Sequence, residues 1–469
     1  MKRRTVWILI FVSFFANRIL LATDTQLQEM FIKGVDLSSL PEVEECGGIF
    51  KEKGIISDPI LIFKNHGVNL VRLRIWHTPS AGYCNLEKTL VMARRIKSMG
   101  LKFLLDLHYS DTWADPGQQS KPESWDGLSF EQLADSVFQY TFNVMASLKK
   151  QNTLPDMVQF GNEIICGLLW DDGCICDSFN TPEQWAQLAE LLGQGILGLR
   201  TALGPGDSVK TMIHIDRGAD NSSSQWFFDH LPGTDMEFDI IGLSYYPWWH
   251  GTLNDLENNV NDLAQRYNKN IFLVETAYPW TLNWNDDTHN MLGNSNQLHR
   301  GYPASVEGQR CFLADLMEII KNIPNYKGLG VCYWEPGWIS APEAGSSWEN
   351  VTLFNFSGEL LSSVSVFEEK ETGLTNHQSL TQYLLLQQNY PNPFNAATTI
   401  QYILPKATNL KLSVCRITGN LVQTLVTGDQ CQGEHKIEWK PATNLPSGIY
   451  LICIHTDEFF DTKKCLLLR

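Results

Sequence analysis

The stretch LVRLRIWHTPSAGYCNLEKTLVMARRIKSMGLKFLLDL, residues 70–107, contains one complete strand–helix–strand unit. Its two ends, residues 70–75 and 102–107, are short apolar runs rich in β-forming residues. Between them apolar residues recur every three or four positions, at Leu86, Leu90, Ala93 and Ile96. This spacing predicts an amphipathic helix, which Gly100 ends. Strands joined through a helix are typical of a parallel sheet.

The same alternation of apolar runs and helical patterns extends over the first three quarters of the chain. Eight apolar runs occur, at residues 31–35, 70–75, 102–107, 157–161, 209–215, 238–243, 271–274 and 328–333. Eight such units predict an α/β fold, the (β/α)8 or TIM barrel, in preference to an open doubly wound sheet. No glycine-rich dinucleotide or phosphate-binding loop follows any run, which further disfavours the open sheet.

The composition changes after about residue 370. A polar stretch precedes short β-rich runs at residues 398–403, 411–417, 421–425, 435–439 and 448–454, separated by turn residues. We therefore predict a barrel domain over residues 23–368, a linker over 369–384 and a small all-β sandwich over 385–469.

The N-terminus has the features of a secretory signal peptide. Lys2, Arg3 and Arg4 precede an apolar run over residues 5–16, and we expect residues 1–22 to be removed. A membrane anchor is the alternative, but a span needs about 20 apolar residues. No other segment is long and apolar enough, so we expect no transmembrane segment in the mature protein. The net charge of −16 argues against nucleic acid or an anionic membrane as partner.

The chain has 11 cysteines, an odd number. Disulfides are permitted in an exported protein. Cys166, Cys174 and Cys176 lie close together in one predicted loop. The spacing lacks a paired CxxC and has no nearby histidine, so a disulfide or free thiols are favoured over a zinc site.

Polar and indole side chains follow the predicted strands at the end where a parallel barrel places its active site. Burying such groups together costs several kcal/mol unless a ligand or mutual pairing compensates. Among them Glu163 and Glu275 each come directly after an apolar run. Glycoside hydrolysis needs such a pair of carboxylates, about 5–5.5 Å apart when the anomeric configuration is retained. A salt bridge to a barrel arginine is the purely structural alternative for either residue.

Several longer stretches resemble glycoside hydrolase family 53, the endo-β-1,4-galactanases. They are KGVD (33–36), GVNLVRLRIW (67–76), LDLHYSDTWADPG (105–117), QFGNE (159–163), LSYYP (243–247), VETAYP (274–279), YPA (302–304), EGQ (307–309) and WEN (348–350). The resemblance runs from about residue 31 to residue 368, in strand order. The HYSDTWADPG segment is the most specific part, whereas the Asn-Glu pair alone indicates only the wider clan of retaining barrel glycosidases.

The resemblance implies a role for each matching residue. Glu163 is expected to be the general acid/base and Glu275 the nucleophile, with Asn162 holding the sugar 2-hydroxyl. Arg72, together with Arg74 on the same face, is expected to orient Glu275, and Tyr246 to donate to it. Tyr245 is expected to point away or to line the cleft. The remaining candidate sugar contacts are His108, Asp111, Trp113, Asp115 and Trp334.

The loop over residues 278–298 is long and polar. In bacterial members of the family that the chain resembles, a long loop at this place can be held by calcium, and Asn285, Asp287 and His289 alternate suitably for it. Only one of the three is a carboxylate, and Ca²⁺ prefers several oxygen donors, so a solvated loop is favoured. No cofactor is expected to be required.

The C-terminal region carries a second resemblance. NYPNPFN (389–395), PSGIY (446–450) and a basic-then-apolar last strand are similar to the sorting domain of the type IX secretion system. This implies export through the periplasm by the secretion machinery, to the cell surface or the medium. Four cysteines, Cys415, Cys431, Cys453 and Cys465, depart from the usual pattern. A carbohydrate-binding module is the alternative for this domain.

Together these patterns predict a secreted retaining endo-hydrolase acting on β-1,4-galactan or type I arabinogalactan. One alternative keeps the mechanism and changes the polymer to mannan, xylan or another β-glycan. Another is a glycan-binding protein without activity, which the presence of both Glu163 and Glu275 disfavours.

Overall fold

A closed barrel of eight parallel strands forms the first part of the computed structural model, which describes residues 30–231, 237–368, 384–456 and 459–469. The strands are β1 (Ile32–Asp36), β4 (Leu70–Ile75), β5 (Lys102–Leu107), β6 (Met157–Phe160), β9 (Lys210–Ile215), β10 (Ile240–Ser244), β11 (Asn270–Thr276) and β12 (Gly328–Tyr333). Their order is β1-β12-β11-β10-β9-β6-β5-β4, and β1 closes the barrel by pairing with both β12 and β4. The predicted (β/α)8 fold is confirmed.

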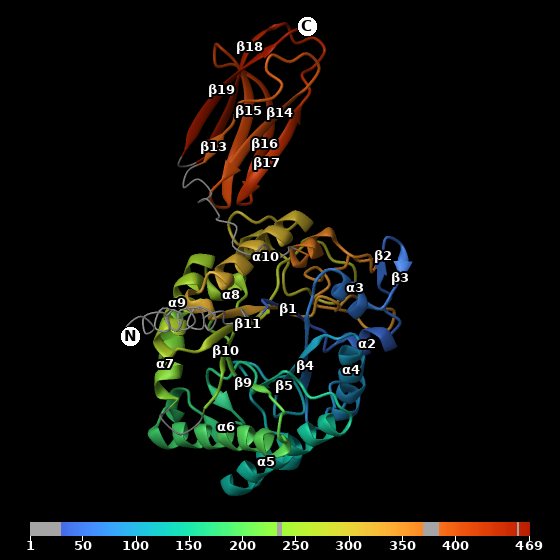
Figure 1. Ribbon diagram of the computed structural model, residues 1–469, viewed down its shortest axis with the longest axis vertical. Coiled ribbons are helices and arrows are strands. Elements are labelled where there is room, and N and C mark those ends of the chain that lie inside the picture. The colour runs from blue at the N-terminus through green and yellow to red at the C-terminus, as the bar shows by residue number, and fades with distance from the viewer. Residues whose placement is uncertain (1–29, 232–236, 369–383, 457–458) are drawn as a thin grey trace, which may run out of the picture. The chain divides into compact units, whose positions relative to one another are not determined.

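Helices outside the strands connect one strand to the next (Figure 1). They are α2 (Leu40–Glu45), α3 (Pro59–Asn65), α4 (Leu86–Ser98), α5 (Phe130–Lys150), α6 (Pro182–Ala202), α7 (Asn221–His230), α8 (Pro247–His250), α9 (Leu253–Tyr267) and α10 (Val306–Lys321). Local sequence sets their ends. At α4, for example, the Asn85 side chain accepts from the backbone N–H of Lys88, and Gly100 follows with a φ of 72°.

Short elements decorate the connections. They are the strand pairs β2 (Lys51–Glu52) with β3 (Ile55–Ile56) and β7 (Gly167–Leu168) with β8 (Gly173–Cys174), and the 3-10 turns Glu123–Trp125, Asp177–Phe179, Ser295–Gln297, Pro324–Tyr326 and Ser362–Phe367. None of the helices in the described ranges is both long and apolar enough to cross a membrane.

The barrel interior changes from apolar to polar along the strands. A buried apolar layer comes from all eight strands, at Ile32, Leu70, Leu104, Met157, Met212, Ile240, Phe272, Val274 and Cys332. Side chains two residues apart on a strand face the same way. The next inward positions are therefore polar, at Arg72, Asp106, Gln159 and His214. This change places the chemistry at the carboxyl ends of the strands.

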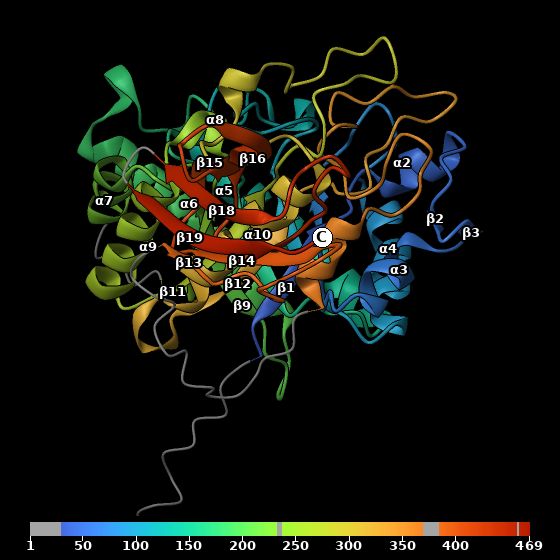
Figure 2. The same ribbon diagram turned by 90° about the horizontal axis from the view of Figure 1, so that it is seen from above.

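The C-terminal part is an all-β sandwich. Its described strands are β13 (Leu385–Leu386), β14 (Thr398–Leu404), β15 (Thr408–Arg416), β16 (Leu421–Gln430), β17 (Gly433–Trp439), β18 (Gly448–Thr456) and β19 (Phe460–Leu467). They form the sheets β13-β14-β17 and β16-β15-β18-β19, the second of which is drawn in red in Figure 2. Alternate residues of both sheets, such as Ile400, Tyr402, Leu412 and Ile452, are fully buried and make up the core.

The predicted signal peptide, residues 1–22, lies outside the described residues, as does the predicted linker 369–384 except for its last residue.

Candidate active site

Arg72 is the centre of a buried polar network at the mouth of the barrel. Its guanidinium Nη1 lies 2.8 Å from Asp36 Oδ2 and 2.8 Å from Glu275 Oε1, and its Nη2 lies 2.8 Å from Asp106 Oδ2. Only 1% of the Arg72 side chain is exposed. A buried cation needs such partners, because an unpaired one costs several kcal/mol. The network fixes the guanidinium and, through it, one oxygen of Glu275.

Glu275 lies near the end of β11, where the register against β10 shifts. Leu243 pairs with Leu273, but the next residue, Ser244, pairs with Glu275, so β11 carries one extra residue at this point. Such a bulge re-aims the side chains that follow it. The Glu275 carboxylate is 6% exposed, and its Oε2 accepts a 3.0 Å hydrogen bond from the Tyr246 hydroxyl. Both oxygens therefore have fixed partners.

Glu163 follows β6 in a tight turn. Gly161 has a φ of 77°, and a Cβ there would lie 2.6 Å from Ile164 Cγ2, so the turn requires glycine. Glu163 itself has a φ of 51°, in the left-handed region that costs a non-glycine residue about 1 kcal/mol or more. Its backbone N–H donates to His214 Nδ1 at 3.3 Å. Strain of this kind, held by surrounding contacts, is typical of functional positions.

The two carboxyl groups differ in their electrostatic surroundings. Burial raises the pKa of Glu163 well above its usual range, and the negative charges of Glu275 and Asp216 raise it further. Burial also raises the pKa of Glu275, but Arg72 and the Tyr246 hydroxyl act in the opposite direction. As pH rises, Glu275 therefore loses its proton before Glu163 does. This order gives one acid and one carboxylate over the same pH range.

Asn162 and His108 belong to the network around Arg72. Asn162 Oδ1 accepts from Arg72 Nη2 at 3.0 Å, and its Nδ2 donates to the Ala114 carbonyl at 2.8 Å. An amide nitrogen carries two protons, so Asn162 retains one for a ligand. His108 is 3% exposed, with Nε2 at 2.9 Å from Asp106 and Nδ1 accepting from Trp76 at 3.1 Å. Both ring nitrogens of His108 thus already have protein partners.

Arg74 does not contact Glu275, contrary to what was expected from its position on the face of Arg72. Its Nη1 lies 2.5 Å from Glu335 Oε1, and its Nη2 donates to Ser39 Oγ at 2.9 Å. The two arginines share a face but differ in height, because residues two apart on a strand are separated by roughly 6.5 Å. Arg74 therefore binds residues that lie closer to the mouth of the barrel than Glu275; we call this the upper level.

Aromatic rings line this upper level. The Arg74 guanidinium lies 4.2 Å from the Trp113 ring centroid. Trp113 in turn lies 6.0 Å from Trp334 and stacks on Trp338 at 6.3 Å. All three indoles are partly exposed. Indole faces with this geometry suit stacking on sugar rings, and Trp338 was not among the predicted contacts.

Tyr245 points away from the nucleophile, one of the two orientations expected for it, and two predicted sugar contacts, Asp111 and Asp115, accept hydrogen bonds from the backbone. The Tyr245 hydroxyl donates to the Gly251 carbonyl at 2.9 Å, away from Glu275. Asp111 accepts from the backbone N–H groups of Thr78 and Glu123, at 2.7 and 2.9 Å. Asp115 accepts from the N–H of Gly117 at 2.7 Å. In these bonds the two aspartates stabilise the loop after β5.

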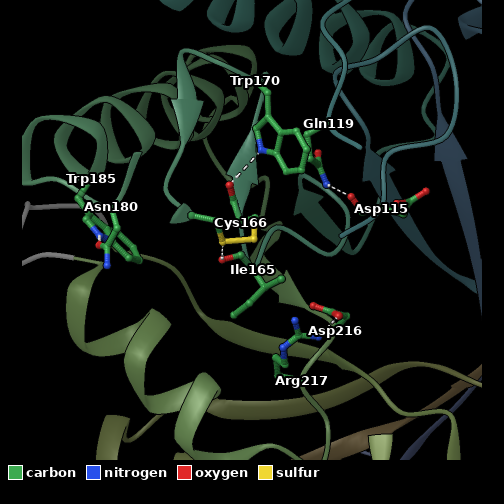
Figure 3. The surroundings of a disulfide bond; sticks show 10 residues. Asp115, Gln119, Ile165, Cys166, Trp170, Asn180, Trp185, Asp216 and Arg217 are labelled. Atoms are coloured by element: carbon green, nitrogen blue, oxygen red, sulfur yellow. Dashed lines mark hydrogen bonds and ion pairs between the residues drawn. A yellow bond between two sulfur atoms is a disulfide. The ribbon is translucent and has the colours of Figure 1, made fainter. Parts of the chain in front are cut away.

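A disulfide joins Cys166 to Cys176 in the loop after Glu163 (Figure 3). Cys174 is free and buried, so of the alternatives for these three cysteines the disulfide holds for two. The Trp170 indole N–H donates to the Cys166 carbonyl at 3.0 Å. Gln119, in the loop after β5, joins that loop to the segment after β6 by donating to the Asn162 carbonyl at 2.8 Å. It also donates to the Asp115 carbonyl of its own loop at 3.1 Å. The segment next to Glu163 is thus tied at several points.

The residues suggested for calcium do not fit a calcium ion as they are placed. Asn285, Asp287 and His289 are all exposed. The Asn285 backbone N–H donates to Glu349 at 2.6 Å, and the His289 ring packs edge-on against Trp284. Within the described residues, no group of three or more His, Cys, Asp or Glu side chains could hold a metal ion.

Sequence reasoning missed the residues that support the predicted ones. These are Asp36, Asp106, Gln159, His214, Asp216, Ser244 and Glu335. All of them except Glu335 lie near a strand end, an even number of residues from an apolar interior position of the same strand, and this spacing was their signal in the sequence.

A (β/α)8 barrel whose mouth holds two carboxyl groups, one buried and paired with arginine and tyrosine and one partly exposed and of higher pKa, has the architecture of a glycoside hydrolase. Comparison with known proteins makes this more specific. The family model described as glycosyl hydrolase family 53 matches residues 32–367, and the chain belongs to this family.

Relatives in sequence and structure agree. An arabinogalactan endo-beta-1,4-galactanase of Cellvibrio japonicus is 35% identical over 335 residues, covering 69% of this chain and 86% of that protein. The GH53 catalytic domain of Ignisphaera aggregans is 38% identical, covers 72% of this chain and 95% of its own, and superposes with a TM-score of 0.67. A fungal beta-1,4-galactanase structure is 33% identical, covers 72% and 99%, and has a TM-score of 0.62.

The C-terminal sandwich matches a second family model, described as a secretion system C-terminal sorting domain, over residues 388–467. The sorting-domain interpretation is therefore confirmed over the carbohydrate-binding alternative.

Proposed function

We propose that this chain is a retaining endo-β-1,4-galactanase in which Glu163 is the general acid/base and Glu275 the nucleophile. The observation that carries the proposal is the asymmetry between the two carboxyl groups. Arg72 lies 2.8 Å from one oxygen of Glu275 and Tyr246 donates to the other at 3.0 Å. Glu163 is partly exposed, lies near two further negative charges and keeps its proton to higher pH.

The reaction then follows double displacement. Glu275 attacks the anomeric carbon while Glu163 gives its proton to the glycosidic oxygen, the C–O bond breaks and a galactosyl ester forms on Glu275. In the second step the Glu163 carboxylate takes a proton from water, whose oxygen attacks the anomeric carbon and releases Glu275. Two inversions leave the β configuration unchanged. No cofactor takes part in either step.

Substrate contacts follow from the same geometry. We assign the free amide proton of Asn162 to the sugar 2-hydroxyl, where a hydrogen bond strengthens in the transition state. Trp113, Trp334 and Trp338 supply stacking faces beyond it. The named galactanases among the relatives support β-1,4-galactan, including type I arabinogalactan, as the polymer.

The sorting domain supports export. We propose that the N-terminal signal directs the chain to the periplasm and that the type IX machinery then carries it to the cell surface or the medium. A neutral polysaccharide outside the cell is a substrate that suits this route.

Product analysis tests the substrate. The protein should release galacto-oligosaccharides from pectic galactan and nothing from mannan or xylan. Pure galactose as the first product would contradict endo action, and equal activity on mannan or xylan would contradict the polymer assignment.

Azide rescue tests the two roles. Glu163→Ala should lose activity on galactan and, with azide and an activated galactobioside, yield the β-azide. Glu275→Ala should yield the α-azide, because azide then attacks directly from the opposite face. Wild-type rates in both variants would overturn the mechanism.

A further inference from the structure

Asp216 is a buried carboxyl group that the catalytic scheme so far leaves unused. It comes directly after β9, two residues beyond His214 and four beyond Met212. Met212 belongs to the apolar layer inside the barrel, and His214 to the polar layer above it. The same parity makes Asp216 the next inward side chain, and it is 4% exposed. Asp216 therefore faces the mouth of the barrel.

Only one oxygen of Asp216 is occupied. Oδ2 pairs with the Arg217 guanidinium, whose side chain is 30% exposed, and Figure 3 shows the two side chains together. Oδ1 is buried and has no hydrogen-bond partner among the described residues. A buried carboxylate oxygen without a donor is unfavourable by roughly 1–3 kcal/mol or more. A proton on that carboxyl group, or a donor from outside, relieves this cost.

The layer beneath Asp216 contacts Glu163 directly. His214 Nδ1 accepts from the Glu163 backbone N–H at 3.3 Å, and His214 Nε2 lies 2.9 Å from Ser244 Oγ. Ser244 in turn acts on the Glu163 carboxyl group, whose pKa it lowers. Glu163 follows β6 and Asp216 follows β9, and these two strands are neighbours in the barrel. Both carboxyl groups therefore lie on the same side of His214.

We propose that Asp216 and Glu163 form a carboxyl pair that shares one proton, so that Asp216 is a positioning residue that keeps Glu163 in its acid form. The inference rests on the proposed role of Glu163. Two like charges placed close together in a buried site do not both ionise readily, so the pair titrates as a unit. Burial raises the pKa of Asp216 to about 6, and the charge of Asp216 contributes to the raised pKa of Glu163.

Other charged and titratable groups face this pair from every side. Around Asp216 and Arg217 these are Asp220 and His250, and around Glu163 they are Glu275, Arg72, His214 and Tyr246. Burial and the charge of Arg72 lower the pKa of His214 well below its usual range, so this ring is neutral. Arg217 lowers the pKa of Asp216 and so favours a negative charge beside Glu163.

A second carboxylate has a particular use in a two-step reaction. When Glu275 becomes an ester it loses its charge and no longer raises the pKa of Glu163. Asp216 is not consumed, so its charge acts on Glu163 in both steps. Glu163 therefore remains basic enough to take the proton from water in the second step.

The test is the pH dependence of kcat/KM in Asp216→Asn, measured with two aryl β-1,4-galactobiosides. The 4-methoxyphenyl glycoside needs a proton on its leaving group, whereas the 2,4-dinitrophenyl glycoside does not. For the former the basic limb should move to lower pH by about one unit or more, because a neighbouring negative charge is lost. For the latter kcat/KM should match wild type at every pH. An unmoved basic limb, or equal losses on both substrates, would overturn the proposal.

Two further variants keep the test decisive. Asp315→Asn neutralises a partly buried carboxyl group on α10, whose pKa burial also raises to about 6, and should leave the limb in place. Arg217→Gln removes the positive partner and should move the basic limb to higher pH, the opposite direction. The Arg217 side chain is 30% exposed, so its replacement should be tolerated. Arg217→Gln therefore decides the outcome if Asp216→Asn does not fold, and a basic limb that does not move in Arg217→Gln contradicts the carboxyl pair.

Failure of the assigned acid is recognised separately. If Glu163 is not the acid, Glu163→Ala will lose kcat/KM equally on both aryl galactobiosides. If Glu163 is the acid and the pair is wrong, Glu163→Ala will lose kcat/KM only on the methoxyphenyl glycoside while Asp216→Asn shows the wild-type limb.

Discussion

Replacing Tyr246 with phenylalanine removes one hydroxyl and little else. The ring packs 5.2 Å from Trp248 and 5.9 Å from Trp348 between centroids, and phenylalanine keeps these contacts. The hydroxyl donates at 3.0 Å to Glu275 Oε2, while Arg72 holds Oε1. Tyr246→Phe therefore perturbs one hydrogen bond to the proposed nucleophile.

The size of the effect follows from that bond. A hydrogen bond to a charged group contributes about 1.5–3 kcal/mol. The bond stabilises the ionised form of Glu275, so its loss raises the pKa of this carboxyl group by about one to two units, at 1.36 kcal/mol per unit. The acid limb of kcat/KM should move to higher pH by the same amount. On the acid side of that limb activity should fall about 10- to 100-fold, tenfold for each unit of pKa.

The assay is the pH profile of kcat/KM on galactan for wild type, Tyr246→Phe and Tyr245→Phe. Tyr245 is the matched control, because it is equally buried but its hydroxyl donates to the Gly251 carbonyl. Thermal unfolding of each variant establishes that the fold is intact. An acid limb at the wild-type position in Tyr246→Phe, or the same displacement in Tyr245→Phe, would refute the reasoning.

Three further predictions concern the network, the disulfide and pH. Arg72→Met should lower the free energy of unfolding by about 3–5 kcal/mol, because it leaves buried carboxylates unpaired. Arg310→Met, at a partly exposed ion pair, should lower it far less. Equal losses for the two variants in urea unfolding would contradict this prediction. The double variant Cys166→Ser, Cys176→Ser should lose about 2–3 kcal/mol of its free energy of unfolding, because the disulfide closes a loop with a sequence separation of 10. Cys46→Ser, at a free cysteine, should be as stable as the wild type. A double variant as stable as the wild type would argue against the disulfide. The pH profile of kcat/KM of the wild type should be bell-shaped, falling as pH drops through the pKa of Glu275 and as pH rises through the pKa of Glu163. Burial raises both pKa values, so the profile should lie at higher pH than it would for exposed carboxyl groups. A profile without a basic limb would contradict the assigned acid.

The strands could be predicted because their signal is local. Residues 70–75, 102–107 and 328–333 were assigned with the bounds that the structure has, and Glu163 and Glu275 followed from their place after apolar runs. The extra residue in β11 was not predictable. A register shift arises from pairing with β10, and single-chain patterns carry no information on it.

Whether a residue contacts the catalytic carboxyl groups depends on its position along the strand as well as on the face of the strand from which it points. Arg72 and Arg74 have the same parity, so sequence gave no reason to separate them, yet only Arg72 reaches Glu275. Asp216 next to Arg217 reads as an ordinary surface ion pair in sequence. Asp216 is buried because it follows β9, which lies between β6 and β10 in the closed barrel. The order of the strands in the barrel is not visible in the sequence around Asp216. Likewise the choice of Cys176 over Cys174 as partner of Cys166 depends on the β7–β8 hairpin.

Trapping the covalent intermediate is the most direct test of the central claim, that Glu275 attacks the sugar. The wild-type protein is incubated with 2,4-dinitrophenyl 2-deoxy-2-fluoro-β-galactobioside and examined by intact-mass and peptide mass spectrometry. We expect one fluorinated disaccharide per chain, attached to Glu275, with activity recovering as the ester hydrolyses. An adduct on Glu163 or Glu335, or dinitrophenol release without any adduct, would contradict the account.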